Sequence, residues 1–113
     1  MKKISKKQTA INRKLKEVYE HIADTRGHYC TGCGRSDVPL SHSHYISRSR
    51  RKYLELDPYN ITYHCLSISQ SANKGCHDLW EGGLSDKQKL LDYHKAMEYI
   101  LENDTELYFL MTD

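Results

Sequence analysis

Apolar residues recur at helical spacing near the start of the chain. They follow one another at intervals of four, three and four residues, which places them on one face of an α-helix. The positions are Ile11, Leu15, Val18 and Ile22. The pattern predicts a helix over roughly residues 5 to 25, and Gly27 is predicted to end it.

The middle of the chain alternates between apolar and polar residues. The alternation runs from Val38 to Ile46 and returns between Tyr53 and Tyr63, where Asp57-Pro58 predicts a turn before the second strand. These patterns predict two short strands that are joined by a basic loop.

Helical patterns return after Cys76. Residues 77 to 81 predict one or two helical turns that end at Gly82-Gly83. Ser85 with Gln88 three residues later is a capping-box signal, and the apolar stripe behind it predicts a helix through about residue 103. We expect this second long helix to pack on the first. Residues 107 to 111 predict a short strand or an apolar tail.

Composition bounds the class of protein. A chain of 113 residues with 38% hydrophobic and 28% charged residues and a mean hydropathy of -0.78 predicts one domain with a small core. Its apolar runs fall short of the roughly 18 residues that a membrane span requires, and no apolar leader precedes a cleavage-site pattern. We therefore expect a cytoplasmic protein with no membrane partner.

Cysteines supply the first candidate chemistry. Two of them form a C-x-x-C pair, and Gly32 between them permits the tight turn that brings two thiolates onto one metal ion. In a reducing compartment this spacing indicates a structural zinc ion rather than disulfides. The alternatives are a secreted, disulfide-bonded chain and a three-cysteine zinc site completed by His64 or His77. The predicted zinc ligands are Cys30, Cys33, Cys65 and Cys76.

Charge is distributed unevenly along the chain. Residues 1 to 52 hold 13 Lys and Arg against 4 Asp and Glu, whereas residues 53 to 113 hold 4 against 11. A basic first half suits binding to a phosphate backbone, although a solvated charged helix is the alternative for its N-terminal lysines. The predicted nucleic-acid-binding residues are Arg48, Arg50, Arg51 and Lys52, which follow the histidines directly.

The order of these residues resembles the HNH endonucleases of the ββα-metal class. The chain shares with them a C-x-x-C pair, a strand that ends in histidine, Asn60 opening the next strand, Cys65 five residues later, and the pair Cys76-His77. It departs from them in the ten residues 66 to 75, where the family has two; we expect a surface loop there.

The resemblance covers about residues 28 to 82 and implies an α+β fold. It predicts a single HNH nuclease domain over residues 1–113, in which a basic N-terminal helix (1–27) and a C-terminal helix and tail (83–113) flank a zinc and ββα-metal core (28–82).

The resemblance also implies roles for the polar residues. His44 is predicted to be the general base that activates water, because Tyr45-Ile46-Ser47-Arg48 resembles the segment after the base in the family. His42 lies on the same strand face and is predicted to reach the metal, although the family usually places that ligand where this chain has Ser43. The shifted register, with His42 as the base, is the alternative.

The remaining site residues complete the predicted centre. Asn60 is predicted to orient the base or to supplement the metal shell. His77 is predicted to bind a catalytic divalent ion, and Glu81 shares its helical face and adds a carboxylate. Mg²⁺, Mn²⁺, Ni²⁺ or Zn²⁺ suits such mixed ligands.

Two functions are compatible with these patterns. The first is a metal-dependent hydrolase that cuts phosphodiester bonds of duplex or branched DNA, alone or within a larger phage or mobile-element complex. The second is a non-catalytic, zinc-ribbon-like module that binds nucleic acid. The polar series around His44 favours the enzyme, because a zinc module has no use for it.

Overall fold

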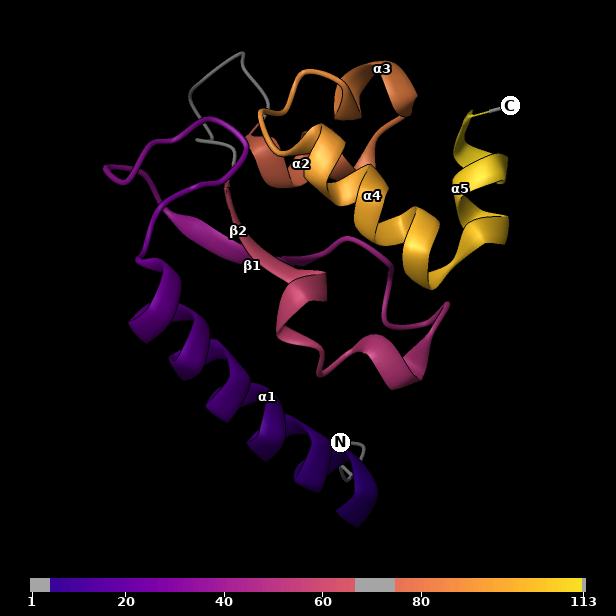
Figure 1. Cartoon of the computed structure of the whole chain (residues 1–113). Coiled ribbons are helices and arrows are strands. Elements are labelled where there is room, and N and C mark those ends of the chain that lie inside the picture. Colours follow the sequence, from indigo (N-terminus) through magenta and orange to yellow (C-terminus); the bar gives the residue numbers. More distant parts are fainter. Residues whose placement is uncertain (1–4, 67–74, 113) are drawn as a thin grey trace.

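The hairpin of two antiparallel strands, β1 (Leu40–His44) and β2 (Ile61–Cys65), is the centre of the fold. The computed structural model describes residues 5–66 and 75–112. Helix α1 (Lys6–Arg26) lies on one side of the hairpin, and α2 (Cys76–Glu81), α3 (Leu84–Lys87), α4 (Tyr93–Asn103) and α5 (Thr105–Thr112) follow on the other (Figure 1). The predicted α+β class is therefore correct. None of the described helices is long and apolar enough to cross a membrane.

Helix α1 begins and ends where the sequence predicts. The side chain of Ser5 accepts a hydrogen bond from the backbone N–H of Gln8 at 3.1 Å, which satisfies one of the free donors of the first turn. Gly27 ends the helix with a φ of 80°, a left-handed conformation that glycine adopts at low cost. Leu15 and Ile22 are buried, which confirms the predicted apolar face.

The register of the hairpin fixes which side chains share a face. His42 pairs with Tyr63 and His44 with Ile61, whereas Ser43 pairs with Thr62 on the opposite face. Ile61 and Tyr63 pack against α1. The other face is covered by the C-terminal half, where Trp80 and Ile100 belong to a separate core cluster.

The strands are shorter than the alternation predicted. Residues before Ile61 form two short 3-10 helices, Lys52–Leu54 and Pro58–Asn60, instead of extended strand. The segment between the strands bonds to itself: Asn60 accepts a hydrogen bond from the backbone N–H of Ile46 and donates to the carbonyls of Ile46 and Leu54. This folding of the loop onto a buried side chain stops the hairpin from extending.

The predicted long helix after residue 85 is wrong. Helix α3 ends at Lys87, α4 begins only at Tyr93, and Ser85 lies inside α3 rather than capping a helix. In the break, the backbone N–H of Leu91 donates to the carbonyl of Gly32 at 2.9 Å, Leu90 is buried, and Asp92 reaches the other face of the hairpin. Tertiary contacts of these residues outweigh the local helical pattern.

Two further expectations also fail. The last segment forms helix α5, which packs on α4, rather than a strand or a tail. Helices α1 and α4 pack on opposite sides of the hairpin instead of on each other (Figure 1). The predicted surface loop of residues 66 to 75 falls almost entirely outside the described residues.

Asp92 ties three parts of the fold together. Its Oδ2 atom accepts hydrogen bonds from Thr31 Oγ1 and Tyr45 OH at 2.7 Å each, and His64 Nε2 lies 2.9 Å away. All of these groups are buried or partly buried, so the carboxylate satisfies donors that are shielded from solvent; Thr31 Oγ1 also lies 3.2 Å from the carbonyl oxygen of Tyr63. Burial alone would raise the pKa of Asp92. The hydrogen bonds from His64 and Tyr45 lower it by more than burial raises it, so the pKa lies below its usual value.

We expect Asp92→Ala to lower the free energy of unfolding by about 3 kcal/mol, because it leaves buried donors without their acceptor. Urea unfolding at neutral pH would measure the change. Glu98→Ala, on the exposed side of α4, is the matched control and is expected to change stability by less than about 0.5 kcal/mol. Equal losses in both variants would contradict the role of Asp92.

The stabilising contribution of the Asp92 carboxylate should depend on pH. Since the pKa of Asp92 is lower in the folded chain than in the unfolded chain, its stabilising contribution is complete above the unfolded value of about 3.9 and is lost as the pH falls through the folded value. The difference in unfolding free energy between the parent and Asp92→Asn should therefore shrink on acidification below about pH 4. A difference that stays constant with pH would contradict this account.

Candidate metal centre and histidine-lined depression

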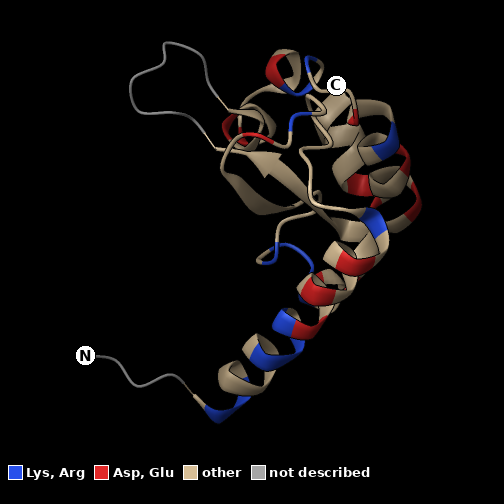
Figure 2. Ribbon diagram, turned by 90° about the vertical axis from the view of Figure 1, so that its left-hand side faces the viewer, with Lys and Arg blue, Asp and Glu red and all other residues tan. Residues whose placement is uncertain are grey.

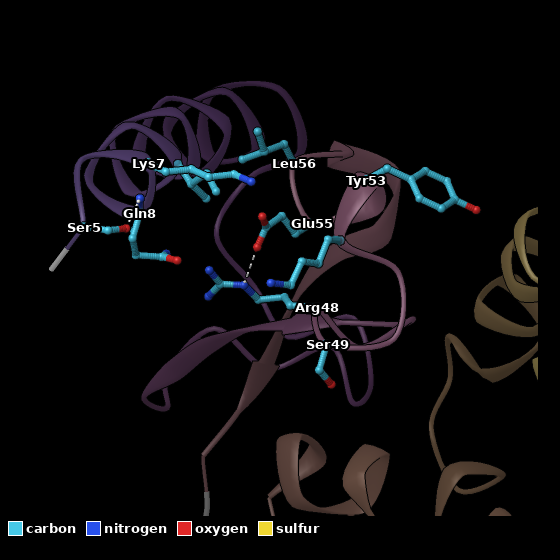
Figure 3. A pocket seen from close by; sticks show the side chains of 10 residues that line it. Ser5, Lys7, Gln8, Arg48, Ser49, Tyr53, Glu55 and Leu56 are labelled. Atoms are coloured by element: carbon cyan, nitrogen blue, oxygen red, sulfur yellow. Dashed lines mark hydrogen bonds and ion pairs between the residues drawn. The ribbon is translucent and has the colours of Figure 1, made fainter.

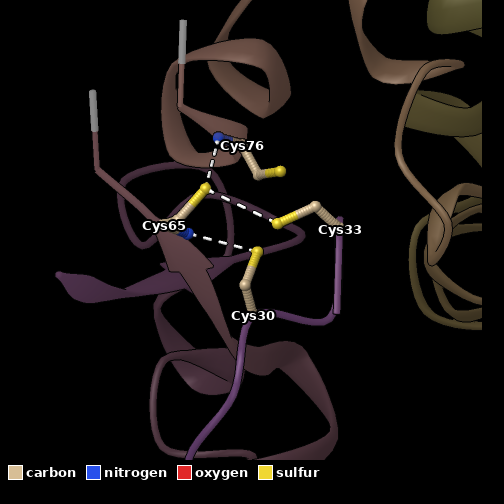
Figure 4. A group of neighbouring side chains, drawn as sticks. All are labelled: Cys30, Cys33, Cys65 and Cys76. Carbon is tan, nitrogen blue, oxygen red and sulfur yellow. Dashed lines mark hydrogen bonds between the residues drawn. The ribbon is translucent and has the colours of Figure 1, made fainter. Parts of the chain in front are cut away.

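Four thiols meet where three segments of the chain approach one another. They come from the loop after α1, the end of β2 and the first residue of α2 (Figure 4). Their sulfur atoms all lie within 4.8 Å of one another, and those of Cys33 and Cys65 are 3.9 Å apart. The group consists of Cys30, Cys33, Cys65 and Cys76.

The local backbone is built for this approach. A Cβ atom at Gly32 would lie 2.9 Å from both Cβ and Sγ of Cys76, so only glycine lets the loop come this close to α2. Backbone N–H groups point at the sulfurs: Cys65 donates to Cys30 Sγ at 3.2 Å, and Cys76 donates to Cys65 Sγ at 3.3 Å. Such N–H···S bonds favour sulfur as the thiolate.

The cluster fits a structural zinc ion. Tetrahedral zinc with Zn–S distances of about 2.3 Å places its sulfurs about 3.8 Å apart, close to the 3.9 Å between Cys33 and Cys65. Burial raises the pKa of Cys76. Burial alone would also raise the pKa of Cys30. Hydrogen bonds from backbone N–H groups, led by that of Cys65, outweigh burial and bring this pKa below its usual value. A dication would offset half of the negative charge of four thiolates packed this tightly.

Neither histidine takes the place of a cysteine. His64 Nε2 lies 2.9 Å from Asp92, and His77 Nδ1 lies 2.8 Å from the hydroxyl of Ser43. Within the described ranges, the four cysteines form a group of metal-ligand type without any histidine.

Three of the four predicted catalytic residues, His42, His44 and His77, line one depression beside this cluster, whereas Asn60 does not. The space holds about 410 Å³ and lies between β1, α2 and the middle of α1. Its walls include His42, Ser43, His44, Arg48, His77 and Glu81. The structure therefore brings the predicted histidines, carboxylate and arginine to one hollow surface.

His44 has a defined orientation. Its Nε2 atom lies 3.0 Å from the carbonyl oxygen of Glu55. Because a carbonyl can only accept a hydrogen bond, Nε2 carries the proton and Nδ1 is left with a lone pair. Burial lowers the pKa of His44, which favours the neutral ring.

His42 is held differently. Its ring stacks on Tyr19 with the ring centres 3.6 Å apart and lies tilted against Tyr63 at 4.8 Å. Burial, followed by the charge of His44, lowers its pKa. Its Nε2 atom is buried and forms no hydrogen bond within the described part of the chain.

Ser43, rather than either strand histidine, contacts His77. Strand alternation turns Ser43 toward α2, and its hydroxyl lies 2.8 Å from His77 Nδ1. Glu81 is exposed one turn further along α2. Among the described residues, the ligand atoms of His42, His77 and Glu81 do not converge as the four sulfurs do.

The side chain of Asn60 forms hydrogen bonds to the backbone rather than lining the depression. It is fully buried, and its Oδ1 and Nδ2 atoms are both bonded to the loop between the strands. Its amide therefore fixes the loop that carries Arg48 and Glu55.

The four basic residues of the loop fall into separate environments. Arg50 and Arg51 form ion pairs with Asp104 at 2.7 and 3.2 Å, which fasten the loop to the end of α4. Arg48 pairs with Glu55 at 3.1 Å beside the depression. Lys52 lies in the same segment and forms no ion pair with any described residue.

Sequence reasoning missed two residues that support this region. Asp92 was placed inside a continuous helix, and Glu55 was not singled out, although its carbonyl orients His44 and its carboxylate holds Arg48. Neither has a signal in the sequence, because both act through contacts between distant segments.

Comparison with protein-family models, with curated proteins and with solved structures gave no match for this chain.

We expect the purified protein to contain one zinc ion per chain and to lose it, with a fall in melting temperature, on strong chelation. All four cysteines belong to the cluster, so a thiol reagent counts only cluster thiols. Few thiols should react before chelation and four after it. Cys33→Ser should lower zinc retention, whereas Ser36→Ala in the same exposed loop should not. Four freely reactive thiols in the untreated protein would contradict the zinc site.

Proposed function

We propose that this protein is a metal-dependent endonuclease that hydrolyses phosphodiester bonds in DNA, with the ββα-metal architecture of the HNH endonucleases. One observation carries the proposal: the depression is lined by a histidine with an available lone pair, by His77 and Glu81 from a helix, and by an arginine. A purely structural zinc module requires only the cysteine cluster.

His44 serves as the general base. The bond from its Nε2–H to the Glu55 carbonyl fixes the ring tautomer, so Nδ1 can take a proton from a water molecule. The lowered pKa keeps the ring neutral near pH 7, which is the state that accepts a proton. An oriented, neutral imidazole is the form that this chemistry requires.

The divalent ion would be held by His77 and Glu81 together with His42, whose ligand atoms would have to move together because they do not converge among the described residues. The buried and unpartnered Nε2 of His42 supports this assignment, because a buried ring nitrogen without a partner is costly unless a ligand satisfies it. When bound, such an ion neutralises charge that develops on the phosphate and on the leaving oxygen. The hydrogen bond between Ser43 and His77 also fixes β1 and α2 relative to each other.

Arg48 and Asn60 support this chemistry from the loop. The guanidinium of Arg48 can pair with a non-bridging oxygen of the substrate phosphate. Asn60 has a positioning role, since it fastens the segment that supplies both Arg48 and the Glu55 carbonyl.

A supercoiled-plasmid nicking assay tests the proposal. We expect nicking with added Mg²⁺, Mn²⁺, Ni²⁺ or Zn²⁺, and a loss of about 100-fold or more in His44→Ala, since a general base contributes at least this factor. His94→Ala, an exposed histidine on α4, is the matched control and should cut like the parent.

The variants also separate the alternatives. If His42→Ala abolishes nicking while His44→Ala retains it, His42 is the base. If no metal supports nicking in zinc-loaded protein that still binds DNA, the chain is a non-catalytic zinc module that binds nucleic acid, and the enzyme proposal fails.

A further inference from the structure

A second depression adjoins the one that contains the histidines. It holds about 620 Å³ and lies between the first half of α1 and the segment that joins the strands. Arg48 and Ser49 line both depressions, so the two share a wall. We call the second one the α1 groove; the lining residues used below are Lys7, Ile11, Arg48, Lys52, Tyr53 and Leu56.

The α1 groove presents positive charge. Lys7 and Lys52 line it and form no ion pair within the part of the chain that the structure describes. In Figure 3, the amine of Lys7 and the guanidinium of Arg48 point toward the same space. Figure 2 shows Lys and Arg gathered on the first half of α1. The groove is thus suited to a polyanion.

Glu55 offsets one positive charge of the groove, that of Arg48, and leaves those of Lys7 and Lys52. Its carboxylate accepts a hydrogen bond from Nε of Arg48 at 3.1 Å. The two terminal amino groups of that guanidinium make no hydrogen bond among the described residues, and Figure 3 shows them directed into the groove. Glu55 therefore orients Arg48 and leaves its two-pronged edge available for a phosphate.

Aromatic and apolar surface accompanies the charge. Tyr53 is 73% exposed, and its ring projects outward from the groove and stacks on no other aromatic ring among the described residues (Figure 3). Ile11 and Leu56 give the groove an apolar part. Cationic side chains along a groove, together with an exposed ring, are the combination that binds single strands, because phosphates and unpaired bases are both accessible there.

We propose that the α1 groove binds an unpaired DNA strand and leads it to the depression that contains His44. This inference rests on the proposed nuclease function and narrows its substrate to DNA with a single-stranded segment, such as an overhang or a branch. A depression of about 620 Å³ has room for a few unpaired nucleotides. The bases of a duplex are stacked inside it and cannot reach Tyr53.

Fluorescence anisotropy with labelled oligothymidylate and a blunt duplex of equal length tests the inference. The parent for every comparison is zinc-loaded His44→Ala protein without added divalent metal, so binding is measured apart from cleavage. We expect the single strand to bind at least tenfold more tightly than the duplex. Adding Lys7→Ala or Lys52→Ala should weaken single-strand binding threefold to tenfold and reduce its salt dependence.

Matched controls separate the groove from general surface charge and from exposed rings. Lys14→Ala removes one charge from the same helix outside the groove lining, and Lys95→Ala removes one from α4; both should stay within twofold of the parent. Tyr53→Ala should weaken binding at least fivefold, whereas Tyr53→Phe should retain it, because stacking uses the ring and not the hydroxyl. Tyr59→Ala, which removes a ring that is 69% exposed elsewhere, should have no effect.

The outcomes distinguish this inference from the proposed function. Equal or tighter binding of the duplex, or losses in the control variants equal to those in the groove variants, would overturn the strand groove even if the protein nicks plasmid DNA. Groove-dependent binding of the single strand without any metal-dependent nicking would retain the groove and overturn the nuclease.

Discussion

The convergence of four thiols is the constraint on which the rest of this structure depends. The cluster holds the loop after α1, the end of β2 and the start of α2 at one point. In a chain of 113 residues with two small core clusters, few other contacts could fix these segments relative to one another. Helix α2 carries His77 and Glu81, and the hairpin carries His42 and His44. The cysteine cluster therefore also sets the shape of the depression.

A second level of positioning lies inside the loop between the strands. Asn60 bonds to the backbone at the start and in the middle of the loop, and Arg50 and Arg51 fasten the loop to Asp104. The fixed loop then presents the Glu55 carbonyl to His44 and the Glu55 carboxylate to Arg48. In this arrangement two arginines that the sequence suggested for DNA binding serve the fold, and Arg48 and Lys52 face the open surface.

The hairpin divides the chemistry between its two faces. His42 and His44 share the face that packs on α1, whereas Ser43 turns to α2 and Thr62 to Thr31. A depression at the edge of the sheet collects side chains from both faces. This explains how Ser43 comes to lie beside His77 although both flanking histidines point away.

The sequence by itself determined the elements whose signals are local. Helical spacing and the cap at Ser5 specify α1, the C-x-x-C pair with Gly32 specifies the knuckle, and Gly82 ends α2. These features depend on neighbouring residues, which interact in the same way whatever the rest of the chain does.

Tertiary structure alone decided the remainder. The helix predicted after Ser85 breaks so that Leu90 and Asp92 can enter the core, and the roles of Asp92 and Glu55 come from partners distant in sequence. A buried polar group must find its partner wherever the fold brings one, and that requirement can override local propensity.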